Sequence, residues 1–202
     1  TGESIPIDRR IGLLDRKLRV INENVDNEKD WYTMAEKAFK HTYGYEWQGD
    51  NLLLAREALL YTYIEYFMDK FNDKDAEGNY VKDANGEFKV PDKRKILNAA
   101  RWISWNIWQM DGLKMVVPDS CDNQYETDLF GLKKKKVCDA CSKGKMIGHI
   151  GVKCIIRDWN LKKPKKWKPK PGEDPHSQPW QKIEFSSLFF GRNMETEEEE
   201  IK

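Results

Sequence analysis

The sequence lacks the segments that direct a chain into a membrane or to export. Its 202 residues contain no apolar run of about eighteen, the length needed to span a bilayer. Residues 1–20 carry charges throughout, which does not fit a secretory signal. We therefore expect a cytoplasmic chain with no membrane partner.

Cysteine is scarce, and several common catalytic motifs are missing. The four cysteines of a cytoplasmic chain are expected to be free thiols or metal ligands rather than disulfides. No Ser-His-Asp order, phosphate-cradling glycine loop or metalloprotease helix occurs. The sequence thus gives no support for a triad hydrolase, a P-loop nucleotidase or a zinc protease.

The sequence contains enough apolar side chains for a core. Its charge is distributed very unevenly along the chain. Hydrophobic residues make up 39% and aromatic residues 12%, which excludes a generic disordered chain. The net charge of +1 conceals fourteen Lys and Arg against two Asp between Lys133 and Lys170. The remainder is acidic and includes the run Glu197–Glu200. Lysine stretches such as 133–136 and 162–170 suit contact with DNA phosphates, although a solvated loop has the same composition.

Apolar periodicity and turn signals predict an α/β fold with a parallel sheet. We expect helices over 8–24, 28–40, 50–71 and 92–103. We expect strands over 41–46, 105–110, 152–159 and 182–185, the last two as a small antiparallel pair or as additions to the sheet edge. Composition divides the chain into an α/β core (1–118), a Cys/Lys-rich insertion (119–181) and a strand with an acidic tail (182–202).

Two acidic residues follow the first two predicted strands. Glu46 ends one strand and Asp111 ends the other. Because ligands bind outside the carboxyl ends of parallel strands, these carboxylates could accept hydrogen bonds from a ribose and from an adenine amine. Acidic residues that cap helices would produce the same pattern.

Two blocks of sequence carry a resemblance to a known family. YGYEWQGDNLLLAREALLYTYIEYF (43–67) and ISWNIWQMDGL (103–113) resemble the second and third cofactor motifs of S-adenosylmethionine-dependent DNA adenine methyltransferases. The closest resemblance is to the restriction endonuclease subunit M type of bacterial restriction-modification systems. The resemblance implies a partial Rossmann-like sheet with flanking helices. It also implies that Glu46 contacts the cofactor ribose and Asp111 the cofactor adenine.

Two further motifs of that family are missing. The sequence has no glycine-rich first motif, and no Asn-Pro or Pro-Pro pair that could belong to the catalytic motif. The resemblance therefore implies the central part of an enzyme that methylates adenine N6, inactive as this chain alone. Its partners would be DNA and the rest of the methyltransferase or a restriction endonuclease subunit. The alternatives are a non-catalytic DNA-binding module and one subunit of a split methyltransferase.

The cysteines and one histidine have the spacing of a metal site. Cys138, Cys141, His149 and Cys154 form the pattern C-x2-C-x7-H-x4-C, which could surround zinc tetrahedrally. Cys121 is an alternative fourth ligand in an all-cysteine set. Unliganded thiols, or a redox-active CxxC pair, would also account for the pattern.

Overall fold

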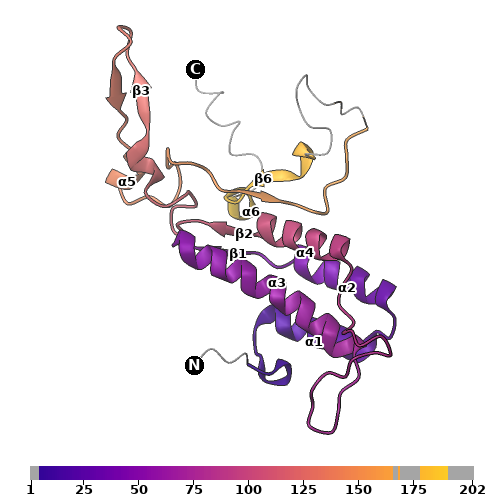
Figure 1. Cartoon of the computed structure of the whole chain (residues 1–202). Coiled ribbons are helices and arrows are strands. Elements are labelled where there is room, and N and C mark those ends of the chain that lie inside the picture. Colours follow the sequence, from indigo (N-terminus) through magenta and orange to yellow (C-terminus); the bar gives the residue numbers. More distant parts are fainter. Residues whose placement is uncertain (1–4, 166–167, 169–177, 191–202) are drawn as a thin grey trace. The chain divides into compact units, whose positions relative to one another are not determined.

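The structure of the protein is a computed structural model that describes residues 5–165, 168 and 178–190 (Figure 1). The acidic run Glu197–Glu200 lies outside these residues, as do 166–167 and 169–170 of the lysine stretch 162–170. The chain divides into two compact units. The first unit comprises 1–44 and 53–107, and the second comprises 45–52 and 108–202.

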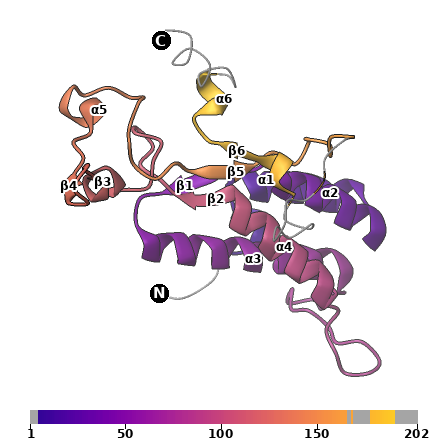
Figure 2. The same cartoon turned by 90° about the horizontal axis from the view of Figure 1, so that it is seen from above.

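The first unit is helical (Figures 1 and 2). A short 3-10 turn, η1 (Ile7–Arg9), precedes four helices: α1 (Leu13–Asn24), α2 (Glu28–Lys40), α3 (Gly49–Phe71) and α4 (Lys93–Asn106). The first turn of α3, 49–52, is assigned to the second unit. Side-chain caps fix where two of them begin. Asn27 accepts a hydrogen bond from the Asp30 amide at the start of α2, and Asp92 accepts one from the Arg94 amide at the start of α4.

Aromatic side chains from α2, α3 and α4 form the centre of this unit. Trp31 is fully buried, with its ring 5.4 Å from that of Tyr63 and 5.3 Å from that of Phe67. Phe39 lies 5.5 Å from Tyr63, and Trp102 lies 6.5 Å from it. α1 packs on α2 through its buried stripe Leu14, Leu18 and Ile21. The unit therefore has a continuous apolar core.

One buried polar side chain completes this packing. Asn106 is 1% exposed, and its side-chain amide donates to the carbonyls of Phe39, Lys40 and Thr42 at 2.9, 3.1 and 3.2 Å. Carbonyls at the end of a helix have no partner within that helix. Asn106, at the end of α4, therefore satisfies the end of α2.

The strands among the described residues are three residues long and pair two by two. β1 (Gly44–Glu46) pairs with β2 (Ile107–Gln109), and β3 (Tyr125–Thr127) pairs antiparallel with β4 (Lys133–Lys135). β5 (Ile155–Arg157) pairs antiparallel with β6 (Lys182–Glu184), which confirms the small antiparallel pair expected there. The second unit also contains η2 (Ser120–Asn123), α5 (Asp139–Ser142), η3 (Pro179–Gln181) and α6 (Ser187–Phe190).

The mixed α/β prediction is confirmed only in its coarse form. The described residues are mostly helical, with three separate two-stranded sheets and no Rossmann-like sheet. The first two expected strands, 41–46 and 105–110, are each only partly strand. The start of the second belongs to α4, which continues to Asn106. In the first, the Thr42 hydroxyl donates to the Ala38 carbonyl of α2. The division of the chain by composition into 1–118, 119–181 and 182–202 stays a prediction. No helix of the described residues is both long and apolar enough to cross a membrane.

Candidate functional site

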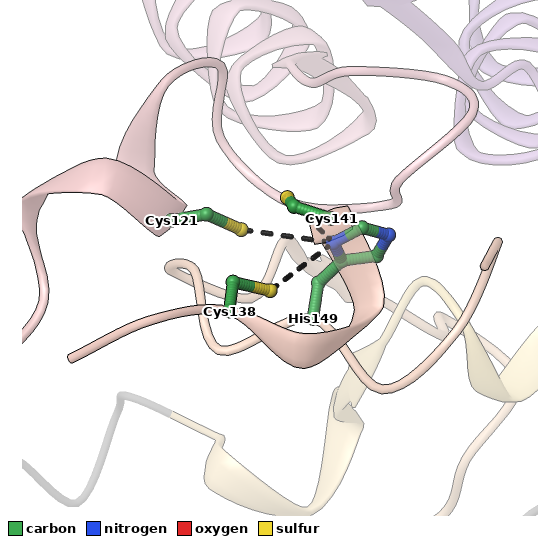
Figure 3. A group of neighbouring side chains, drawn as sticks. All are labelled: Cys121, Cys138, Cys141 and His149. Atoms are coloured by element: carbon green, nitrogen blue, oxygen red, sulfur yellow. Dashed lines mark hydrogen bonds between the residues drawn. The ribbon is translucent and has the colours of Figure 1, made fainter. Parts of the chain in front are cut away.

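Three cysteines and one histidine of the second unit converge on one point (Figure 3). The ligand atoms of Cys121, Cys138, Cys141 and His149 all lie within 4.8 Å of one another. The three sulfurs lie 3.7, 3.6 and 3.4 Å from His149 Nδ1. Zinc bond lengths of about 2.3 Å to sulfur and 2.0–2.1 Å to nitrogen, at a tetrahedral angle, give about 3.6 Å. This Cys3His group could therefore hold a metal ion such as zinc.

Short local elements bring these ligands together. Cys121 lies in η2, Cys138 is the residue that precedes α5, and Cys141 lies within α5. The CxxC spacing spans one helical turn, so both sulfurs lie on the same side of α5. His149 comes from the loop that follows, where its Nε2–H donates to the Lys145 carbonyl at 2.8 Å. That bond leaves Nδ1 free to bind a metal.

A small apolar cluster and one glycine support the ligands. Cys121 and Cys138 are buried with Val116 and Ala140. A Cβ on Gly151 would lie 2.5 Å from Ser120 Oγ and 3.0 Å from Cys121 Sγ. No side chain fits there, so glycine at 151 lets the chain pass directly behind Cys121.

The electrostatics of the group favour a cation. Desolvation raises the pKa of Cys138, but hydrogen bonds from the backbone of Ile150 and Cys141 outweigh it and lower this pKa to about 6. Desolvation and the thiols of Cys138 and Cys121 raise the pKa of Cys141 to about 11. The thiolate form of Cys138 is thus favoured at neutral pH, and a metal that binds Cys141 must displace its proton.

Lys114 lies beside this negative group. The Cys141 sulfur is the main cause that raises the pKa of Lys114, and Asp111, with Oδ2 at 3.7 Å from Nζ, adds to it. A zinc ion bound by three thiolates and one imidazole carries a net charge of −1. Lys114 is placed to offset that charge.

The structure brings together three of the four ligands proposed from spacing. Cys138, Cys141 and His149 belong to the group, whereas Cys154 lies elsewhere and Cys121 is the fourth member. Cys154 is buried beside Met110 and Met115, and its Sγ–H donates to the Gln109 carbonyl at 3.5 Å. Its backbone carbonyl accepts from the Phe185 amide, which holds it at the β5–β6 pair. Burial raises the pKa of this thiol to about 11.

Between the ligands Cys121 and Cys138 the chain forms a hairpin, β3–β4, which we call the basic hairpin (125–135). Figure 1 shows α5 at its foot. Every residue of its two strands is exposed, and β4 consists of Lys133, Lys134 and Lys135. The sequence interpretation missed this element because lysine is uncommon in strands. Asp128 and Gly131, which form the turn, are the signal that could have found it.

The two acidic residues proposed as cofactor ligands lie at neighbouring strand ends. Glu46 is the last residue of β1, and Asp111 follows β2 by two positions. The Met110 amide donates to the Glu46 carbonyl at 3.0 Å, so the two chain segments run side by side here. The backbone thus brings the two positions together.

Their carboxylates are engaged by nearby backbone amides. Glu46 Oε1 accepts from Trp47 and Gln48 at 2.9 and 3.2 Å. Asp111 is 4% exposed, and its Oδ1 accepts from Leu113 and Lys114 at 2.9 and 3.1 Å. Both side chains therefore have a structural role at these positions.

A shallow hollow of about 430 Å³ lies next to these strand ends. It is lined by Trp47, Gln48, Gly49, Asp50, Gln109, Pro118 and Asp119. The residues that line it are mostly polar, with Trp47 and Pro118 as the larger apolar members, and Glu46 and Asp111 are not among them.

Comparison of the chain with protein-family models, with curated proteins and with solved structures found no match. The resemblance to adenine methyltransferases therefore stays a prediction. What the chain does has to be inferred from the geometry of its described residues.

Proposed function

We propose that this chain is a non-catalytic DNA-binding module in which zinc holds the basic hairpin for contact with phosphates. One observation supports this above all others: two of the four ligands, Cys121 and Cys138, stand at the two feet of the hairpin. A metal bound there ties the feet together. An isolated two-stranded hairpin is only marginally stable in water, so a metal that links its two ends would stabilise it.

The hairpin also carries the charge that contact with DNA requires. Side chains opposite one another in an antiparallel pair share a face. The pairs Tyr125–Lys135 and Thr127–Lys133 therefore put two lysines and two neutral side chains on one face. Glu126 and Lys134 are paired on the other face, where their charges cancel. The first face is the one that suits a polyanion.

This module fits the family that the sequence resembles. A methyltransferase that modifies adenine must hold duplex DNA while one base leaves the stack. We infer that this chain supplies contacts to DNA phosphates, and that methyl transfer to adenine N6 needs motifs that this sequence lacks. The rest of such a methyltransferase, or a restriction endonuclease subunit, would be its protein partner.

A second candidate function is binding of the nucleoside part of S-adenosylmethionine. It is favoured by the neighbouring positions of Glu46 and Asp111 and by the hollow beside them. The two carboxylates would support the loops that line this hollow. Calorimetric titration with S-adenosylmethionine tests the idea: Glu46→Gln should weaken binding, whereas the exposed Glu77→Gln should leave it unchanged.

Fluorescence anisotropy with a labelled DNA duplex tests the leading proposal. Zinc-loaded protein should bind with a marked salt dependence, and removal of the metal with a chelator should abolish most of the binding. The variant Lys133→Gln/Lys135→Gln should bind more weakly and reduce the slope of log K against log salt by about 2. The matched control, Lys29→Gln/Lys37→Gln on the exposed side of α2, removes the same charge from the first unit.

The control variant should bind as the parent protein does. Equal losses in the two variants would mean that only net charge matters, which contradicts a dedicated hairpin. Zinc-loaded protein that binds no duplex at low salt would overturn the proposed function itself.

A further inference from the structure

Two large apolar side chains at the tip of the basic hairpin are almost completely exposed. Leu129 is 101% exposed and Phe130 is 88% exposed. Burying an apolar side chain stabilises a protein, so leaving two adjacent ones in water is unfavourable. Isolated exposed apolar residues are ordinary, but a pair at the end of a projecting element is a candidate contact surface.

The turn that carries these side chains is held by four hydrogen bonds. The Asp128 amide donates to the Leu132 carbonyl, and the Gly131 amide donates to the Asp128 carbonyl, both at 3.0 Å. Asp128 Oδ1 accepts from the Phe130 and Leu132 amides, both at 2.9 Å. Gly131 has a φ of +79°, which glycine adopts without strain. The tip is therefore preorganised to project Leu129 and Phe130.

Dimensions and charge together indicate what the tip contacts. The major groove of DNA admits a two-stranded ribbon and is about 8.5 Å deep. Lys133 lies two to three residues behind the tip, which is roughly 7–10 Å at about 3.4 Å per residue. When the tip reaches the base edges, Lys133 is therefore level with the phosphates at the rim of the groove.

We propose that the basic hairpin enters the major groove of duplex DNA and that Leu129 and Phe130 contact the methyl groups of thymine. The inference rests on the proposed function, because it names the part of DNA that the same hairpin reads. Among the four bases, only thymine presents an apolar group in the major groove. An apolar tip that continues into a strand of lysines is complementary to that methyl group beside a phosphate backbone.

Replacement of thymine by deoxyuridine tests this contact directly, because it removes only the methyl group. The full chain, loaded with zinc, is titrated with two duplexes of identical sequence that contain either dT or dU. Loss of each contacted methyl group should weaken binding by about fourfold. Leu129→Ser/Phe130→Ser should bind both duplexes with nearly equal affinity, and Lys133→Gln should lose affinity for both in the same proportion.

The zinc content of each variant, measured by elemental analysis, verifies that the metal centre is intact. A parent protein that does not distinguish dT from dU would overturn the inference, and so would tip variants that still distinguish them. Tip variants with undiminished DNA binding would indicate that the tip contacts a protein partner instead. In each of these cases the salt-dependent binding would persist, and the proposed function would stand. Absence of any binding to duplex DNA would overturn both this inference and the proposed function.

Discussion

The buried side chains of the helical first unit differ in kind from those around the metal centre. In the helical unit, Trp31, Phe39, Tyr63 and Phe67 pack as rings in one core. Around the metal centre, the side chains that meet are thiols and an imidazole, backed by small apolar residues. The first arrangement is stabilised by apolar area removed from water, and we propose that the second is stabilised by bonds to a metal. The two regions should therefore lose their folded structure under different perturbations.

Removal of the metal should have the largest effect, and the effect should be confined to the second unit. Structural zinc in small domains contributes about 10–16 kcal/mol of binding free energy at pH 7, and that energy is spent on folding. Chelation, or Cys138→Ser, should therefore abolish protection of backbone amides from hydrogen exchange over 120–150. The helices α1 to α4 should keep their protection, because their core contains none of the ligands.

The matched control for Cys138→Ser is Cys154→Ser, which changes a buried thiol outside the Cys3His group. This control should retain one zinc ion per chain and the protection of 120–150. Loss of metal in Cys154→Ser with retention in Cys121→Ser would show that the ligand set first proposed from spacing is the correct one.

A core substitution in the helical unit should give the converse result. Trp31→Ala removes a fully buried indole that contacts two aromatic rings, and such changes cost about 3–5 kcal/mol of unfolding free energy. Thermal or urea unfolding followed by circular dichroism measures the loss. The exposed Tyr61→Ala, on α3, should change stability little. Zinc content should stay at one ion per chain, and if Trp31→Ala released the metal, the two regions would not be independent.

The helices were predictable because their information is local. The bounds expected for the second helix, 28–40, are those of α2, and the start of the long helix differs by one residue from that of α3. Both have an apolar period and the first has an N-cap that the sequence shows directly. The extended parallel sheet that the sequence predicted is not among the described residues, which form three separate two-stranded sheets, because strand pairing depends on contacts between distant segments. Its two expected strands each shorten to three residues.

The metal centre shows the same limit at the scale of single ligands. Cys138 and Cys141 are one helical turn apart, so their spacing alone brings their sulfurs together. The choice between Cys121 and Cys154 depends on how the chain returns behind Gly151, which no spacing reveals. The hairpin that separates Cys121 from Cys138 was not predicted, because lysine is uncommon in strands. Local patterns thus predicted most of the ligands, and tertiary contacts decided the last one.

The smallest effect should come from a single hydroxyl in the helical core. Tyr63 is fully buried, and within the described part of the chain its hydroxyl has no hydrogen-bond partner. A buried hydroxyl without a partner costs free energy, so Tyr63→Phe should raise the unfolding free energy at pH 7 by about 1 kcal/mol. Urea unfolding measures this change, and a loss of several kcal/mol would mean that the hydroxyl is bonded after all.

The pH dependence of the unfolding free energy of Tyr63→Phe tests whether burial of the Tyr63 hydroxyl causes this change. Burial raises the pKa of Tyr63 well above its usual value, with smaller contributions from Tyr32 and Glu36. The folded protein therefore favours the neutral phenol, and stability is fully present below about pH 10 and declines above it. The decline attributable to Tyr63 should approach about 1.4 kcal/mol per pH unit and be absent in Tyr63→Phe. Burial also raises the pKa of Tyr32 and Tyr66, but both proteins retain these, so the difference between the two curves reports Tyr63 alone.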